Sequence, residues 1–418
     1  MSMMTTAAAA TERDALSLLT AQAVRDRATQ MLQIGLNDGL SHFRIDLDRM
    51  DDVADAVLAT TAKNYPSLDI PFHARWRHFA IDGVDRWAGI AGRVKWPDRA
   101  ARARAEFDLA IVSVLLDAGA GAAWRYHDDV SGKAIGRSEG LAIASLDVFA
   151  RGVFSSNASD SLRVDADKLA EFTVAALEQG FQVSAENPLV GLEGRAELLR
   201  RLGRLVASRN EIFGLNDTPR PGGLFDHLMA RAQGNAIAAA SILREVLLQL
   251  GPIWPSRLTL AGIPLGDCWT HPAIKTGDAT EGLVPLHKLS QWLTYSLIEP
   301  IQRAGIEVTD IDGLTGLAEY RNGGLFVDLG ALVLRNPADA ARAHEVDSTL
   351  VVEWRALTVA LLDRLAEKIR ARLNRDARSL PLASLLEGGT WAAGRAAAFA
   401  RRADGSPPIK VISDGTVF

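Results

Sequence analysis

The chain has 418 residues, of which 48% are hydrophobic and 23% charged, and its formal net charge at pH 7 is -5. This length is enough for two or three domains, or for one large domain with a well-buried core. The acidic balance argues against a protein that binds nucleic acid through a basic face.

The single cysteine, Cys268, limits the redox and metal chemistry of the chain. One cysteine can form neither an internal disulfide nor a cysteine-rich zinc site. A thiol nucleophile is one interpretation of Cys268, but a small buried apolar residue is the favoured one. Only His73 and His78 lie close together in sequence, and their spacing does not place both on one helix face. We therefore expect no metal and no cofactor.

The sequence shows no sign of a membrane or export segment. No apolar run approaches the roughly 18 residues that would span a bilayer. Residues 1–11 are rich in Ala and Thr and lack the basic region of a signal peptide. We therefore expect a cytoplasmic protein without a membrane partner.

Hydrophobic periodicity predicts a mostly α-helical fold with a few short strands. The predicted helices, in chain order, cover residues 11–37, 49–63, 162–179, 192–208, 235–250, 286–299 and 348–373. Pro300 should end the sixth helix at Glu299, and Ser348 is a plausible N-cap of the last. Predicted strands cover residues 257–260, with Ala261-Gly262 as a hairpin turn, and 409–412.

Gly/Pro punctuation suggests where the chain divides. A loose boundary between Gly180 and Pro188 separates an N-terminal helical part, residues 1–185, from a C-terminal part, residues 186–418. Both parts are expected to contribute to one pocket.

The first run with chemical potential is residues 71–79, which contains His73 and Arg75 among further basic and aromatic residues. Arginine and aromatic side chains together can hold a phosphate and stack on a flat base. The alternative is an amphipathic turn with its aromatics in the core, and the residues alone slightly favour it.

The second run extends from Trp124 to Tyr126 and continues at residues 136–140, whose Gly-x-Ser-x-Gly spacing matches a nucleophile elbow. That motif needs a strand before the serine. Residues 131–135 are a poor strand, so we interpret the match as accidental. Ser138 is expected to N-cap the following helix, with Glu139 in its first turn.

Three further runs lie in the C-terminal part. Lys288 shares a predicted helix face with Trp292, and its alternative interpretation is a lysine extending to solvent. Residues 319–321 place a carboxylate, a phenol and a guanidinium together before a Gly-Gly break, although a Glu–Arg surface pair would look the same. Residues 353–355 lie within the last predicted helix, where a solvated face is the simpler interpretation.

Residues 72–79, 137–141 and 313–321 together resemble the uracil catabolism protein four family, over nearly the whole chain. The resemblance implies a role in a route that opens the pyrimidine ring and yields urea and a ribose product. The C-terminal half is more distantly similar to the queuosine-nucleotide N-glycosidases. Leu314-Thr-Gly-Leu-Ala-Glu-Tyr-Arg321 occupies their Leu-Thr-x-Phe-Ala-Asp-Tyr-Arg motif, which implies a multi-helix fold resembling helix-hairpin-helix DNA glycosylases.

The same similarity implies site residues. The motif's catalytic Asp falls on Glu319, a helical lysine falls on Lys288, and a Glu-x-Arg falls on Glu353 and Arg355. Glu319 is one methylene longer than the Asp, which would suit a smaller or shifted substrate or accompany a loss of activity. Gly323-Gly324 also replaces the Pro-Gln that follows the motif.

The resulting hypothesis is an N-glycosidase that hydrolyses ribosylurea, or its 5′-phosphate, to urea and ribose or ribose phosphate. A carboxylate would stabilise the oxocarbenium-like transition state, and a proton donor would assist urea departure. The expected catalytic residues are Glu319 and Glu353, and the expected substrate-binding residues are Lys288, Tyr320, Arg321, Arg355, Trp124, Arg125, Tyr126, Glu139, His73 and Arg75. The proton donor is left open among Glu353, Tyr320 and His73.

Two other functions fit the sequence less well. A non-catalytic nucleotide-binding regulatory protein of the same pathway would bind a ligand without turnover. A DNA glycosylase is disfavoured by the acidic balance, so a small nucleoside- or nucleotide-derived molecule is the expected partner, with no nucleic acid.

Overall fold

The computed structural model describes residues 11–214, 218–254 and 258–412, and it is mostly helical with short strands. Residues 11–17 are helical, and the α-helices that follow are α2 (Ala21–Leu36), α3 (Met50–Asn64), α4 (Arg86–Ala91), α5 (Arg99–Leu115), α6 (Arg137–Ala150), α7 (Ala166–Ala170), α8 (Val174–Gly180), α9 (Leu192–Ser208), α10 (Asn210–Phe213), α11 (Gly223–Met229), α12 (Ala239–Leu250), α13 (Lys288–Arg303), α14 (Tyr320–Asp328), α15 (Thr349–Leu373), α16 (Leu382–Leu385) and α17 (Trp391–Arg401). Short 3-10 segments cover Leu47–Arg49, Arg75–Phe79, Gly251–Ile253, Ile311–Gly313 and Pro337–Ala341, and a π-helical turn covers Leu386–Thr390. The described helices include none that is long and apolar enough to cross a membrane.

The strands join in pairs and build no larger sheet within the described residues. The antiparallel pairs are β1 (Phe43–Ile45) with β12 (Leu332–Leu334), β2 (Ala80–Ile81) with β3 (Val84–Asp85), β4 (Tyr126–Asp128) with β5 (Lys133–Ile135), β7 (Thr259–Leu260) with β8 (Ile263–Pro264), and β9 (Cys268–Thr270) with β10 (Leu283–Pro285). The parallel pairs are β6 (Ala236–Ala238) with β11 (Glu307–Thr309), and β13 (Ala343–Glu345) with β14 (Lys410–Ile412).

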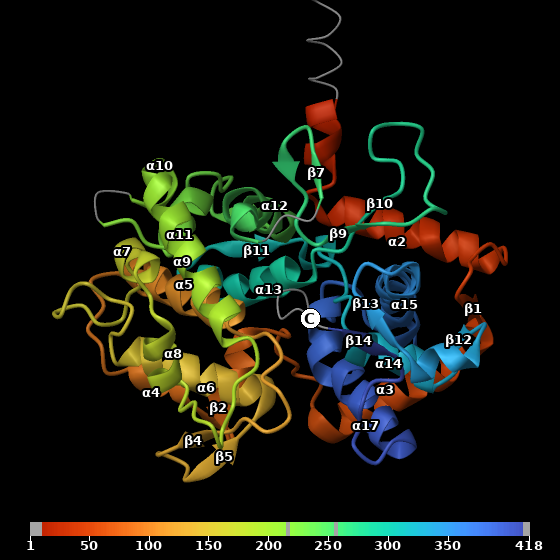
Figure 1. Ribbon diagram of the computed structural model, residues 1–418, viewed down its shortest axis with the longest axis horizontal. Coiled ribbons are helices and arrows are strands. Elements are labelled where there is room, and N and C mark those ends of the chain that lie inside the picture. Colours follow the sequence, from red (N-terminus) through yellow and green to blue (C-terminus); the bar gives the residue numbers. More distant parts are fainter. Residues whose placement is uncertain (1–10, 215–217, 255–257, 413–418) are drawn as a thin grey trace, which may run out of the picture.

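The helices form two groups (Figure 1). Helices α4 to α11, coloured orange to green, lie on one side, and α2, α3, α14, α15 and α17 lie on the other. Helices from the early and late parts of the described chain therefore lie together, since α2 packs against α15 and α3 against α17. One hydrophobic core extends through both groups. The proposed division near residue 185 stays a prediction.

Several predicted elements are confirmed. Helices α3, α9 and α15 follow their predicted spans closely, and the Ser348 hydroxyl caps α15 by accepting from Val351 N. The hairpin of β7 and β8 turns at Ala261-Gly262, where both residues adopt positive φ; Arg257 lies outside the described residues. Strand β14 lies within predicted residues 409–412. Cys268 is buried, as the favoured interpretation required.

Two predicted helices are broken by internal caps. The span 11–37 divides before α2, because the Thr20 hydroxyl accepts from Ala23 N at 3.1 Å and begins a new helix. The span 162–179 becomes α7 and α8, with Thr173 capping α8. The span 235–250 was also too long, since residues 236–238 form β6 before α12. Periodicity extends across such caps because both sides face one core.

The prediction that Pro300 ends its helix was wrong, since α13 continues to Arg303. A proline in a helix leaves the carbonyl four residues earlier without its usual donor. Here that carbonyl belongs to Ser296, and it accepts from the indole Nε1 of Trp76 at 2.7 Å. A side chain from a distant segment therefore satisfies the group that would otherwise favour ending the helix.

The prediction that Ser138 caps α6 was also wrong. The N-cap is Gly136, which makes no side-chain cap bond, and Glu139 lies in the first turn as expected. The Ser138 hydroxyl instead donates to the Asp117 carboxylate. Gly323-Gly324 is likewise no break, because both glycines lie inside α14.

Candidate functional site

A cavity of about 460 Å³ lies where segments from both helix groups meet. Its walls come from the start of α6, the first turns of α13 and α14, the loop after α5, the beginning of α17, and the C-terminal segment before and within β14. The lining residues used below are His73, His78, Asp117, Arg137, Ser138, Glu139, Lys288, Trp292, Glu319, Tyr320, Arg321, Asp404, Gly405 and Ser406. The cavity thus unites four of the five runs that the sequence singled out, and only residues 353–355 contribute nothing to its wall.

Glu319 is the N-cap of α14 and is 9% exposed. Its carboxylate accepts from Arg321 N at 2.7 Å and from Asn322 N at 2.6 Å. Burial raises the pKa of Glu319, while the two backbone donors and the positive charge of Lys288 oppose that rise. A carboxylate has about four acceptor positions, so two backbone donors leave capacity for a ligand or water.

Lys288 is the first residue of α13 and is half-buried in the cavity wall. Burial lowers the pKa of Lys288, and the negative charges of Glu319 and Asp117 oppose the shift. Among the described residues no ion pair joins Lys288 to Glu319, although each acts on the charge of the other. A cation at a helix N-terminus opposes the helix dipole, so this position does not serve helix stability.

Tyr320 and Arg321 follow Glu319 at the cavity rim. Burial against the wall raises the pKa of the Tyr320 phenol, and the charge of Glu319 adds to the rise. The Arg321 guanidinium lies 5.2 Å from the Tyr320 ring centre and donates to the carbonyl of Gly405 at 2.8 Å. Arg321 therefore both lines the cavity and fastens the C-terminal segment over it.

Two histidines and an indole form the wall nearest residues 71–79. His73 Nδ1 lies 2.8 Å from the Glu387 carboxylate, and its ring stacks on Trp292. Burial, and next the charge of Arg75, hold the pKa of His78 well below its usual value. His78 is therefore a neutral imidazole at neutral pH and can accept or donate through its ring nitrogens.

Asp117 lines the cavity, and the sequence interpretation missed it. Its carboxylate accepts from Ser138 Oγ at 2.6 Å and from the Arg75 guanidinium at 2.8 Å. The sequence analysis predicted that Arg75 binds the substrate. Arg75 is instead completely buried and does not line the cavity, so it holds Asp117 from behind the wall. The only signal in the sequence was the run of small residues after Asp117, which allows close approach.

Of the predicted binding residues in the second run, Glu139 lines the cavity, whereas Trp124, Arg125 and Tyr126 do not. The Trp124 indole is buried and donates to Phe181 O, and the Tyr126 hydroxyl donates to Asp147. Arg125 donates to the carbonyls of its own loop. These three residues support the helix group behind the site, because their polar atoms are directed to the protein itself.

Glu353 and Arg355 also lie outside the cavity wall, contrary to the sequence prediction. The buried Glu353 carboxylate accepts from Ser41 N at 3.2 Å and His42 N at 3.1 Å, and it lies 3.2 Å from His271 Nε2. Arg355 is bound to Asp267. Both side chains point from α15 into the protein interior, so the simpler interpretation, a solvated face, was wrong as well.

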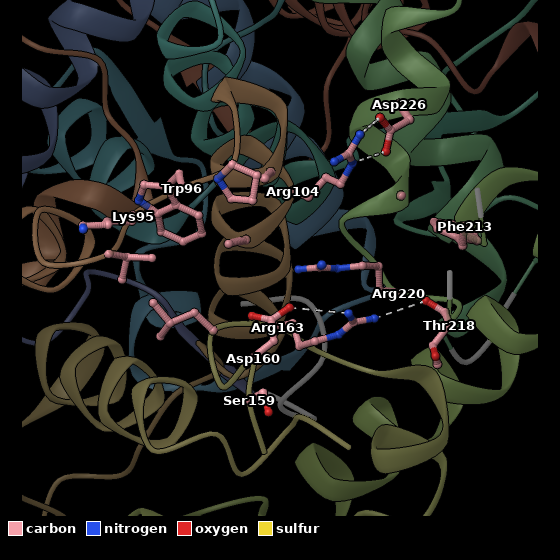
Figure 2. Close-up of a pocket in the computed structure, with 16 residues that line it drawn as sticks. Lys95, Trp96, Arg104, Ser159, Asp160, Arg163, Phe213, Thr218, Arg220 and Asp226 are labelled. Carbon is pink, nitrogen blue, oxygen red and sulfur yellow. Dashed lines mark hydrogen bonds and ion pairs between the residues drawn. The ribbon is translucent and has the colours of Figure 1, made fainter. Parts of the chain in front are cut away.

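A second cavity, of about 440 Å³, contains several arginines (Figure 2). Arg104 of α5 and Asp226 of α11 lie side by side in its wall and are joined by two hydrogen bonds of 2.7 Å. Arg220 Nε donates to Asp108 at 2.9 Å, and Arg163 Nε donates to Asp165 at 2.7 Å. Because carboxylates of the protein already neutralise these cations, this cavity is a weaker candidate for anion binding.

Comparison with known proteins places the chain among relatives of its own length. A family model described as "Protein of unknown function (DUF1688)" matches residues 17–418. The chain is 39% identical over 411 residues to a Schizosaccharomyces pombe protein named "Protein urg3", covering 96% of this chain and 98% of that protein. It is 38% identical over 434 residues to "Uracil catabolism protein 4" of Lachancea kluyveri, covering 94% of this chain and 97% of that protein. These matches confirm the resemblance predicted from the three motifs.

Proposed function

We propose that this chain, which belongs to the DUF1688 family, is an N-ribosyl hydrolase of uracil breakdown whose active site is the cavity around Glu319. The observation that supports this most is the arrangement of Lys288 and Glu319. Both line one cavity, and no ion pair between them neutralises either charge within the described residues. The name of the Lachancea kluyveri relative supports the pathway.

In the proposed reaction, Glu319 acts on the anomeric carbon. Cleavage of a ribosyl–nitrogen bond develops positive charge on the sugar, and an adjacent carboxylate stabilises that charge. The backbone donors from Arg321 and Asn322 fix the carboxylate while leaving acceptor capacity. The same carboxylate can therefore orient the water that completes hydrolysis.

The leaving nitrogen of urea needs a proton. Of the donors considered from the sequence, Tyr320 and His73 line the cavity, and Glu353 does not. The proposal therefore keeps Tyr320 and His73 as candidates and removes Glu353 from the catalytic set.

Ribosylurea or its 5′-phosphate is the proposed substrate. A cavity of about 460 Å³ is in the range of small-molecule sites. Lys288 and Arg321 supply positive charge for a phosphate, and Arg137, at the start of α6, adds a cation that the sequence interpretation did not include. Arg355 is not part of this set.

The likeness to helix-hairpin-helix DNA glycosylases, a cytoplasmic location and the absence of nucleic-acid binding stay predictions from the sequence.

The deciding experiment compares urea release from ribosylurea and from its 5′-phosphate by the wild type and Glu319→Gln. Wild-type release that falls at least about 100-fold in Glu319→Gln, with ligand binding retained, is expected. Glu307→Gln, an exposed carboxylate on β11, is the matched control and should keep full activity. Saturable binding without release by the wild type would instead indicate the regulatory nucleotide-binding protein.

A further inference from the structure

A buried ion pair lies behind the cavity and outside its wall. Arg355 of α15 donates through both terminal nitrogens to the two carboxylate oxygens of Asp267, each at 2.8 Å. The Arg355 side chain is 2% exposed and that of Asp267 14%. The guanidinium charge is the main force that lowers the pKa of Asp267 to about 2, against the opposing effect of burial. Asp267 is therefore an anion at neutral pH.

Each partner of this pair also makes a hydrogen bond to the backbone of a cavity residue or of the residue before one. Asp267 Oδ2 accepts from the backbone N–H of Lys288 at 2.9 Å. On the other side, Arg355 Nε donates to the carbonyl of Ala318, the residue before Glu319, at 3.1 Å. A single ion pair thus connects the first turn of α13 to the start of α14.

The turn that leads into Lys288 needs such support. His287 has a φ of 47°, a left-handed conformation that non-glycine residues adopt rarely and at an energetic cost. The Asp267 carbonyl accepts from Leu286 N at 2.9 Å and from His287 N at 3.1 Å. Asp267 therefore binds this turn through its backbone as well as its side chain.

A second set of buried contacts joins the same two segments. Thr315 N donates to Gln291 Oε1 at 2.9 Å, and the Tyr295 hydroxyl donates to Thr315 O at 2.9 Å. These contacts hold the body of α13 against the segment before Glu319. At the two ends that face the cavity, Asp267 and Arg355 supply the contact that joins the one segment to the other.

We propose that the Asp267–Arg355 ion pair is the positioning device that fixes the Lys288 ammonium relative to the Glu319 carboxylate in the cavity wall. The expected effect of the ion pair on turnover rests on the proposed function. Its expected effect on the position of Lys288 does not. A two-fold hydrogen-bonded Arg–carboxylate pair has a defined geometry, which a lysine cannot reproduce. Buried ion pairs are weak evidence for stability, so orientation is the better reason for this one.

The two charges of the ion pair also act in opposite directions on the pKa of Lys288. The charged groups that act on Lys288 are Glu319, Asp117 and Asp267, which raise its pKa, and Arg355, which lowers it. Removing only the negative partner would leave Arg355 uncompensated and lower the pKa of Lys288 further. Replacing Arg355 by lysine keeps the charge but loses the planar fork, so it tests geometry separately from charge.

The experiment compares Arg355→Lys and Asp267→Asn with the wild type in the full chain. Steady-state kinetics of urea release give kcat and KM for each variant. The pH dependence of reductive methylation of Lys288 with formaldehyde and cyanoborohydride, quantified by mass spectrometry, measures the pKa of Lys288 without any substrate. Arg104→Lys is the matched control, because Arg104 also makes a two-fold bond to an aspartate, Asp226, at the second cavity (Figure 2).

Arg355→Lys should lower kcat about 10- to 100-fold, because a small misplacement of the Glu319 carboxylate relative to a substrate held by Lys288 has that effect. Asp267→Asn should move the Lys288 methylation profile to lower pH. Arg104→Lys should do neither. The proposal is overturned if the folded Arg355→Lys variant keeps wild-type kcat, or if folded Asp267→Asn keeps the wild-type methylation profile.

The same experiment distinguishes failure of the glycosidase proposal from failure of the positioning proposal. If the wild type releases no urea, the methylation profile of Lys288 in Asp267→Asn still decides whether the ion pair controls this residue. Thermal melting identifies any variant that does not fold, and the other variant then decides. Loss of folding in both, with Arg104→Lys folded, would overturn the proposal in favour of a purely structural pair.

Discussion

Two carboxylates, Glu319 and Asp117, line one cavity in different surroundings. Asp117 is bound by the Arg75 guanidinium and the Ser138 hydroxyl, so side chains from two distant segments hold it in place. Glu319 is bound by two backbone N–H groups, and burial raises its pKa. The two carboxylates therefore differ in their partners, since side chains hold Asp117 and the backbone of α14 holds Glu319. The motif identified Glu319, but the partners of Asp117 come from distant segments and leave no local pattern.

Lys288→Met should move the acidic limb of the kcat/KM profile to higher pH. The positive charge of Lys288 lowers the pKa of Glu319, so its removal raises that pKa, and a higher pH is then needed to ionise Glu319. The measurement is urea release across pH 4–9. Lys275→Met, which removes an exposed lysine, is the control. An unchanged acidic midpoint in Lys288→Met would contradict the assigned role of Glu319.

At the scale of elements, the apolar periodicity of the sequence predicts where the helices lie, and capping contacts decide where they begin and end. Helix α9 follows its predicted span because its apolar stripe and its ends agree. The break before α2 depends on one threonine hydroxyl, and the continuation of α13 past Pro300 depends on the Trp76 indole. The first of these is a local signal that could have been found in the sequence. The second is a contact between segments far apart in the chain, which periodicity cannot reveal.

Helix α9 offers a matched pair of glycine substitutions. A Cβ at Gly203 would lie 2.3 Å from Ala170 N and 2.6 Å from Ala166 O, so the backbones of α7 and α9 would have to separate. Gly203→Ala should therefore destabilise the protein by about 1–3 kcal/mol, as overpacking does. Gly194 has open space around its Cβ position, and Gly194→Ala should stabilise by up to about 1 kcal/mol through helix propensity. Urea denaturation measures both, and equal effects would contradict this packing.

At the scale of the whole molecule, the cavity depends on the return of the C-terminus. Asp404, Gly405 and Ser406 line the cavity after the last helix. The Arg402 guanidinium donates to both carboxylate oxygens of Asp328 in α14, at 2.8 and 2.5 Å, and to the carbonyl of Ser406 at 2.6 Å. Strand β14 then pairs with β13 and fixes the segment against the rest of the fold.

Arg402→Met should weaken substrate binding more than catalysis. Without its bonds to Asp328 and Ser406 O, the segment that closes the cavity is held less firmly, so KM should rise about 3- to 10-fold while kcat changes less, the pattern of a lost uniform binding contribution. Arg401→Met changes an exposed neighbour and should leave both constants unchanged. Steady-state kinetics of urea release provide the test. A KM rise of the same size in both variants would point to net charge as the cause.

The sequence by itself determined the helical class and the family, and it proposed Lys288 and Glu319 as site residues, because periodicity and short motifs are local properties of the chain. Only the tertiary structure decided which motif residues share the cavity. It placed Glu353, Arg355 and the Trp124 region outside the wall and brought Asp117 and the C-terminal segment into it. The physical reason is that a charged residue on a helix has the same local pattern whether it faces a cavity, solvent or a buried partner. Its partner is chosen by contacts between segments distant in sequence, such as Asp267 with Arg355.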